Sequence, residues 1–248
     1  KMFQLTHYEI LKILRQRGNW FALAFWIFVS SLLFFYLLKD YTFQKQLAVA
    51  QMGVTQGVVK PFWGWMLFVL YIGAPMLTIL NLGLEHSQKS YHFWILHRFP
   101  VSQYIFPKLL GLLTVQTLGL LLILAIPLSL FSVTTIDFGL LCSGFVTVWC
   151  MMFFMVSLSL ALYVATLNAF FSLMLTYSCV LIFSIMPGFS TFPKLTQWLN
   201  YVSPLQHAHG LMNGRLYVTD VFYFVFIITI LIAFCLSKMQ KRFRKLDY

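Results

Sequence analysis

Long uncharged apolar stretches alternate with short polar segments along the whole chain. A helix needs about 20 apolar residues to cross a bilayer. We predict six transmembrane helices, over residues 20–38, 61–84, 109–133, 138–164, 168–187 and 221–238. The fourth and fifth divide one uncharged run, 138–193, which is too long for a single span. The most polar point of that run, around Thr166, Leu167 and Asn168, marks the predicted break.

The segment before the first span has a helical period. Its apolar residues share one face and its polar residues the opposite face: Phe3, Ile10, Leu11 and Leu14 against Glu9, Lys12 and Gln16. A helix over residues 1–19 that lies on the membrane surface is predicted. An ordinary basic flank beside the first span is the alternative.

The segment between the second and third spans is a short amphipathic helix over residues 85–98, ended by the sequence Phe-Pro-Val-Ser that contains Pro100. Its polar residues recur at i, i+3, i+4 and i+7, and its apolar residues follow the same period. The polar set is Glu85, Gln88, Lys89 and His92, and the apolar set is Leu84, Tyr91, Trp94 and Ile95. Two such faces suit a contact with a soluble partner.

Residues 188–220 are too apolar for a free loop and too rich in proline and glycine for a spanning helix. A re-entrant or interfacial pair of short helices is predicted there.

Composition supports one class of protein. Hydrophobic residues make up 60% of the chain and charged residues 9%, whereas about a quarter of the residues in a soluble domain are charged. The sequence therefore predicts an all-α integral membrane protein, a single transmembrane domain over 1–248, with no separate soluble domain.

The basic residues set the expected orientation. Most of the 17 Lys and Arg residues belong to the amino-terminal segment, the 85–108 segment and the tail. Cytoplasmic loops carry the excess of Lys and Arg, so both termini and the amphipathic helix are expected in the cytoplasm. The net charge of +11 is then explained by anionic lipid head groups, and no nucleic-acid partner is expected.

The chain contains no phosphate-binding G-x-x-x-x-G-K-[ST] motif, no H-E-x-x-H and no G-x-S-x-G. His207 and His209 are two residues apart and point in different directions on a helix, so no metal site is predicted. The spans carry essentially no ionisable residue of the kind that proton-coupled transporters use. We expect no catalytic site and no cofactor, and any transport would need an external energy source.

Two stretches of the sequence resemble the permease subunits of type-2 ABC exporters. In the family an acidic residue ends the second span, a basic amphipathic helix follows, and the third span opens with a lysine. The matching residues are Glu85, Lys89, Ile95-Leu96, Pro100-Val101-Ser102 and Lys108. The family's second motif matches Ser203-Pro204-Leu205-Gln206-His207, Gly214, Asp220-Val221 and Tyr223. The resemblance is closest to the branch of gliding-motility and nitrous-oxide-reductase maturation permeases.

The sequence departs from this branch at two places, which bear on the substrate more than on the fold. His86, Ser87 and Gln88 stand where the branch has a second acidic residue and more arginine. Ala208-His209 replaces the usual Phe-Glu.

The resemblance implies a multi-pass protein of the bacterial cytoplasmic (inner) membrane. Two permease chains, as a homodimer or a related heterodimer, would bind two cytoplasmic ATPase subunits that hold ATP and magnesium. The 85–98 helix would be the coupling helix, with Tyr91, Trp94 and Ile95 in an apolar groove of the ATPase. Charge pairing would set its register. The implied ATPase-coupling residues are Glu85, Gln88, Lys89, Tyr91, His92, Trp94, Ile95, Arg98 and Pro100, and the implied re-entrant motif is Ser203, Pro204, His207, Gly214 and Asp220.

Two other classes of function stay open. An intramembrane lipid-modifying enzyme would need converging polar side chains in the spans, which the sequence lacks. A non-transporting scaffold would use residues 85–102 only to recruit a soluble partner.

Overall fold

The structure is a computed structural model and describes residues 2–46, 53–87, 100–189, 200–214 and 217–246. The regular elements among these residues are all helical. In chain order they are α1 (Met2–Arg15), α2 (Arg17–Gln46), the π-helical turn η1 (Thr55–Val59), α3 (Lys60–Ser87), α5 (Val101–Leu128), the 3-10 turn η2 (Ser129–Ser132), α6 (Phe138–Thr166), α7 (Ala169–Phe189), α9 (Pro204–Met212) and α10 (Val218–Leu246).

Five helical segments of the described part are long and apolar enough to cross a membrane. They are Arg17–Lys45, Thr55–Glu85, Val101–Ser132, Phe138–Thr166 and Val218–Arg242. The chain is therefore a helical multi-pass membrane protein. The predicted span 168–187 corresponds to α7, whose described apolar part, Ala169–Ser184, is shorter than these five.

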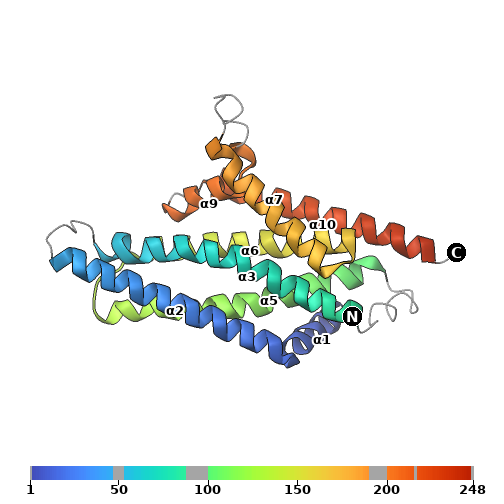
Figure 1. Cartoon of the computed structure of the whole chain (residues 1–248), viewed down its shortest axis with the longest axis horizontal. Coiled ribbons are helices and arrows are strands. Elements are labelled where there is room, and N and C mark those ends of the chain that lie inside the picture. Colours follow the sequence, from blue (N-terminus) through green and yellow to red (C-terminus); the bar gives the residue numbers. More distant parts are fainter. Residues whose placement is uncertain (1, 47–52, 88–99, 190–199, 215–216, 247–248) are drawn as a thin grey trace.

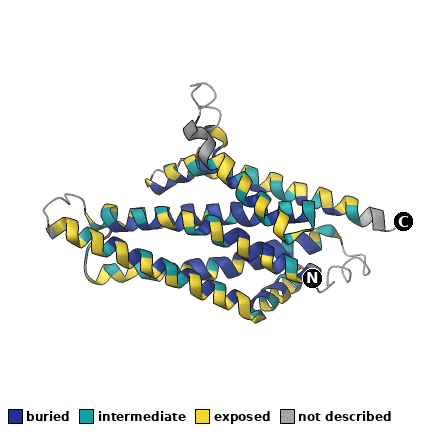
Figure 2. Cartoon of the chain, viewed as in Figure 1, coloured by how far each residue is buried: buried dark blue, intermediate teal, exposed yellow. Residues whose placement is uncertain are grey.

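The long helices α2, α3, α5, α6 and α10 run roughly along one axis, and α7 crosses them obliquely (Figure 1). Both termini lie at the same end of the bundle, which we call the terminal end (Figure 1). Helix α6 is central, because 61% of its most apolar stretch is buried, against 28% for α2 and 22% for α10. Exposed residues accordingly follow α2 along its length (Figure 2).

Local sequence explains where α6 begins and ends. The side chain of Asp137 caps its first turn, with Oδ1 accepting from the backbone N–H of Gly139 at 2.8 Å. Leu167 follows its last residue in a left-handed conformation, with φ of 54°, and turns the chain into α7. The helix break thus lies at the expected position, between Thr166 and Ala169.

Two predicted boundaries need correction. Helix α5 begins at Val101, eight residues before the predicted third span, because Pro100 in an extended conformation starts it directly. Lys108 is therefore inside a membrane helix, where it is 2% exposed. Helix α3 likewise continues to Ser87, so Glu85 belongs to the end of α3 and does not begin a separate helix.

Residues Met2–Arg15 of the amino-terminal segment form α1, and part of its polar face is buried in the bundle. Glu9 is 2% exposed and Ile13 is 5% exposed, whereas Phe3 is 84% exposed. Helix α1 packs with Glu9 and Ile13 against α5, where Gly111 allows the close approach. The Glu9 side chain points into the bundle because it faces the buried cation Lys108 of α5.

Within the predicted re-entrant segment 188–220, α7 extends to Phe189 and α10 begins at Val218. Between them the described residues contain α9, which packs on α6 and contacts α3, α7 and α10. Its start has a clear cause, since Ser203 is extended and Pro204 occupies the first helical turn.

Five buried hydroxyl groups in the bundle are satisfied within their own helices. Ser30, Thr78, Thr147, Ser159 and Thr176 each donate to a carbonyl one turn earlier, at 2.7–2.8 Å. This arrangement lets short polar residues sit in an apolar interior at little cost.

Candidate functional site

Four charged residues from three helices meet at the terminal end of the bundle, and we call them the charge cluster: Glu9, Lys12, Glu85 and Lys108. Lys12 Nζ lies 2.6 Å from Glu85 Oε1. Lys108 Nζ contacts the other carboxylate oxygen, Oε2, of Glu85. Lys108 Nζ also lies 4.0 Å from Glu9 Oε1. Glu85 of α3 is thereby joined to α1 and to α5.

The charge cluster is buried and formally neutral, with two carboxylates and two ammonium groups. The side chains of Glu9 and Lys108 are 3% exposed and that of Glu85 is 10% exposed, while Lys12 reaches 21%. Burying one charge alone is very costly, whereas a paired set is tolerated. Each buried charge in the cluster is therefore compensated by a neighbour of opposite sign.

The helices that carry the cluster place these side chains for local reasons. Glu9 and Lys12 are three residues apart on α1, so both project toward the same side. Tyr104 lies one turn before Lys108 on α5, and its ring centroid is 4.7 Å from Lys108 Nζ. The ring face adds a favourable cation–π contact to the ion pairs.

Further buried polar residues continue along α3 from Glu85. Asn81 exchanges two hydrogen bonds with Asn19 of α2, at 2.9 and 3.0 Å. Next, Gln116 of α5 donates to Thr78 at 3.2 Å. Positions 78, 81 and 85 share one face of α3, so α3 presents a polar stripe to α1, α2 and α5.

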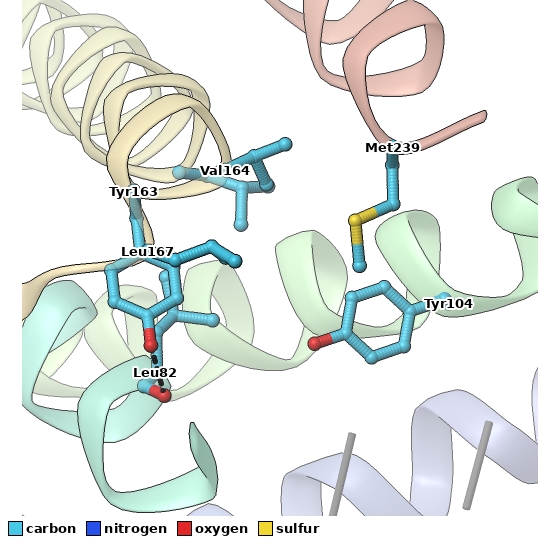
Figure 3. A pocket seen from close by; sticks show the side chains of 7 residues that line it. Leu82, Tyr104, Tyr163, Val164, Leu167 and Met239 are labelled. Atoms are coloured by element: carbon cyan, nitrogen blue, oxygen red, sulfur yellow. Dashed lines mark hydrogen bonds between the residues drawn. The ribbon is translucent and has the colours of Figure 1, made fainter. Parts of the chain in front are cut away.

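A small cavity of about 20 Å³ is lined by Tyr104 and by residues of three other helices (Figure 3). Its walls include Leu82, Tyr163 and Met239, and the Tyr163 hydroxyl donates to the Leu82 carbonyl at 3.0 Å. The space suffices for about one water molecule, so it is no substrate site. The residues that line it instead belong to the ends of α3, α5, α6 and α10, which pack against one another here.

The structure describes two of the predicted coupling residues. Glu85 is buried in the charge cluster, and Pro100 is exposed at the start of α5. The remaining seven lie outside the described residues: Gln88, Lys89, Tyr91, His92, Trp94, Ile95 and Arg98. The described residues on either side of these seven thus belong to α3 and to the start of α5.

A second polar group joins α9 to α10, and we call it the α9–α10 clasp: His207, Asp220 and Tyr223. His207 Nδ1 lies 2.7 Å from Asp220 Oδ1, and Nε2 lies 3.0 Å from the Tyr201 carbonyl oxygen. The imidazole stacks on the Tyr223 ring with centroids 4.0 Å apart. Both ring nitrogens therefore lie within hydrogen-bond distance of an oxygen atom, which holds the imidazole between Asp220 and the Tyr201 carbonyl.

The other predicted motif residues surround this clasp. Ser203 is buried directly before α9, and Pro204 is the first residue of that helix. Gly214 follows α9 with φ of +75°, a conformation that glycine adopts readily. Four of the five motif residues thus lie on α9 or directly beside its ends, and Asp220 of α10 is bonded to one of them, His207.

Sequence reasoning missed Glu9, Lys12 and Lys108 as site residues. Lys108 had a usable signal, since it is a single cation between apolar residues of one helix. No feature of the sequence singled out Glu9 and Lys12, because an amphipathic helix with an exposed polar face has the same pattern of polar and apolar residues. Among the described residues no group of three or more His, Cys, Asp or Glu side chains is placed to hold a metal ion.

Comparison with known proteins adds no family assignment. No protein-family model matches this chain, and no curated protein sequence matches it.

Proposed function

We propose that this chain is the permease subunit of an ATP-driven ABC exporter. A separate ATPase subunit would supply the energy, and the cargo would cross the cytoplasmic membrane of a bacterium. Two such chains would pair, and each would bind one ATPase that holds ATP and magnesium. In this proposal α7 is the sixth span, α1 lies on the cytoplasmic surface, and α9 belongs to a re-entrant segment.

One observation carries the proposal. The segment that the resemblance assigns as coupling helix connects the end of α3, which contains Glu85, with the start of α5 at Val101. Glu85 is bonded to Lys12 on α1 and to Lys108 on α5. A partner that pushed this segment would therefore act on three connected helices.

The mechanism follows from the stiffness of these connections. Ion pairs at low exposure resist separation because each separated charge would remain buried and unpaired. A displacement of the end of α3 would thus carry α1 and α5 with it. The Asn19–Asn81 pair extends the connection to α2. The four helices would tilt together, and α9 would remain attached to α10 by the clasp.

Purification of the chain from its native membranes, followed by reconstitution with the co-purifying ATPase, tests this function. We expect an equimolar ATPase with a phosphate-binding loop, whose rate of ATP hydrolysis depends on the permease. Replacing both Trp94 and Ile95 with alanine is expected to weaken this assembly without preventing membrane insertion. A chain that inserts normally but neither binds such an ATPase nor alters its rate would refute the proposal and favour a scaffold.

A further inference from the structure

An open apolar groove of about 560 Å³ runs between α2 and α3. Aromatic side chains form much of its wall, with Phe21 and Phe25 from α2 and Trp65 and Phe68 from α3. Ligand sites in proteins commonly enclose about 300 to 1,000 Å³. The groove is therefore large enough for an extended ligand.

The floor of the groove is shaped by one close contact. A Cβ atom at Gly73 of α3 would lie 2.1 Å from Nε1 of Trp26 of α2. The missing side chain lets the indole lie directly on the backbone of α3, and Trp26 is 5% exposed. This contact holds α2 and α3 together at the floor of the groove, while the groove stays open on its other side.

The groove is about as long as the acyl chain of a lipid. Its α2 wall extends from Phe21 to Leu33, which is about 18 Å at the rise of an α-helix. One leaflet of a bilayer has about 15 Å of hydrocarbon. Both walls belong to membrane-crossing segments, so the groove lies within the hydrocarbon and opens toward lipid.

A positively charged side chain, Arg17, lies at the terminal end of the groove. Arg17 precedes Phe21 and Phe25 by four and eight residues, and therefore shares their face of α2. It is exposed and forms no ion pair with a described residue. The two carboxylates that the structure describes at this end, Glu9 and Glu85, already belong to the charge cluster.

We propose that the α2–α3 groove is a binding site for an anionic phospholipid. One acyl chain lies between Phe25 and Phe68 above Trp26, and the phosphate lies at Arg17. Basic side chains at the rim of spans bind anionic head groups, and exposed Trp20 occupies the interfacial level where indoles are common. The inference does not depend on the exporter assignment.

Native mass spectrometry of the delipidated protein in detergent tests the site. The probes are phosphatidylglycerol and phosphatidylcholine with the same 16- and 18-carbon chains. We expect one phosphatidylglycerol per chain, retained at least tenfold more tightly than phosphatidylcholine. Arg17→Gln should remove this preference, whereas Lys241→Gln, an exposed cation on α10, should leave it unchanged.

A filling substitution tests the acyl part. Ala22→Trp, inside the groove, should abolish retention of both lipids, while Leu122→Trp on the exposed face of α5 should not. Equal retention by all variants, or equal loss in Arg17→Gln and Lys241→Gln, would overturn the site. So would efficient disulfide cross-linking of two Phe25→Cys chains in membranes, because a second copy would then occupy the groove.

Discussion

The ammonium group of Lys12, in α1, lies 2.6 Å from Oε1 of Glu85, near the end of α3. Lys108 of α5 contacts the other oxygen of the same carboxylate. A single acidic residue near the end of α3 thus joins three helices. The consequences for stability and for coupling can be measured separately.

Lys108→Met is expected to lower the free energy of unfolding by about 3 to 5 kcal/mol, because Glu9 and Glu85 would stay buried with one cation between them. Thermal or denaturant unfolding in detergent micelles measures the change. Lys241→Met on α10 removes an exposed cation and should change stability little. A loss at Lys108 no larger than at Lys241 would contradict the buried charge cluster.

Replacing Glu85 and Lys108 together with apolar residues, as Glu85→Leu with Lys108→Met, should recover part of that stability, because Glu9 and Lys12 stay behind as groups of opposite charge. Removal of a whole buried pair is often close to neutral. If the charge cluster transmits force, ATP hydrolysis by the assembled complex should nevertheless lose its dependence on the permease. A double variant that is stable and fully coupled would show that the charge cluster is only structural.

Asn19 and Asn81 are expected to show measurable coupling in a double-mutant cycle with leucine. Their two hydrogen bonds lie in a buried helix contact. Polar pairs in membrane bundles have coupling energies that average about 0.6 kcal/mol and reach about 1.7 kcal/mol. Unfolding of the wild type, both single variants and the double variant gives the value. Additive effects would argue that the two amides do not bond to each other.

His207→Gln and Asp220→Asn should each loosen α9 from α10. Hydrogen bonds that involve a charged group contribute about 1.5 to 3 kcal/mol. Hydrogen exchange of residues 204–212 should increase in both variants, while α6 remains protected. His209→Gln is the matched control, because His209 is exposed on the same helix. Unchanged exchange in the His207 variant would refute the clasp.

Gly210→Ala should destabilise the same junction, since the added Cβ would lie 2.8 Å from Asp220 Oδ2. Alanine otherwise favours helices over glycine by about 1 kcal/mol. Gly64→Ala in α3 meets only Met212 Cε at 3.8 Å and should be neutral or stabilising. The difference in melting temperature between the two variants measures the effect, and a Gly210 variant as stable as the Gly64 variant would contradict this packing.

The positions of the helices were largely predictable, because lipid permits few alternatives to continuous apolar helices. The break at residues 166–168 followed from one polar point in a long apolar run, and the resemblance brought both Glu85 and His207 forward as candidates. The contacts of these residues were not predictable. The partner of Glu85 on α1 is remote in sequence, and the partner of His207 lies in a different helix.

Composition and apolar period by themselves determined that this is a helical membrane protein and which segments could cross the bilayer. Only the tertiary structure decided that α1 turns Glu9 inward, that Lys108 lies inside a membrane helix, and that α2 and α3 leave a groove open to lipid. The physical reason is that a periodic pattern reports which residues share a helical face. The neighbour of that face is set by charge pairing and close packing between helices distant in the sequence.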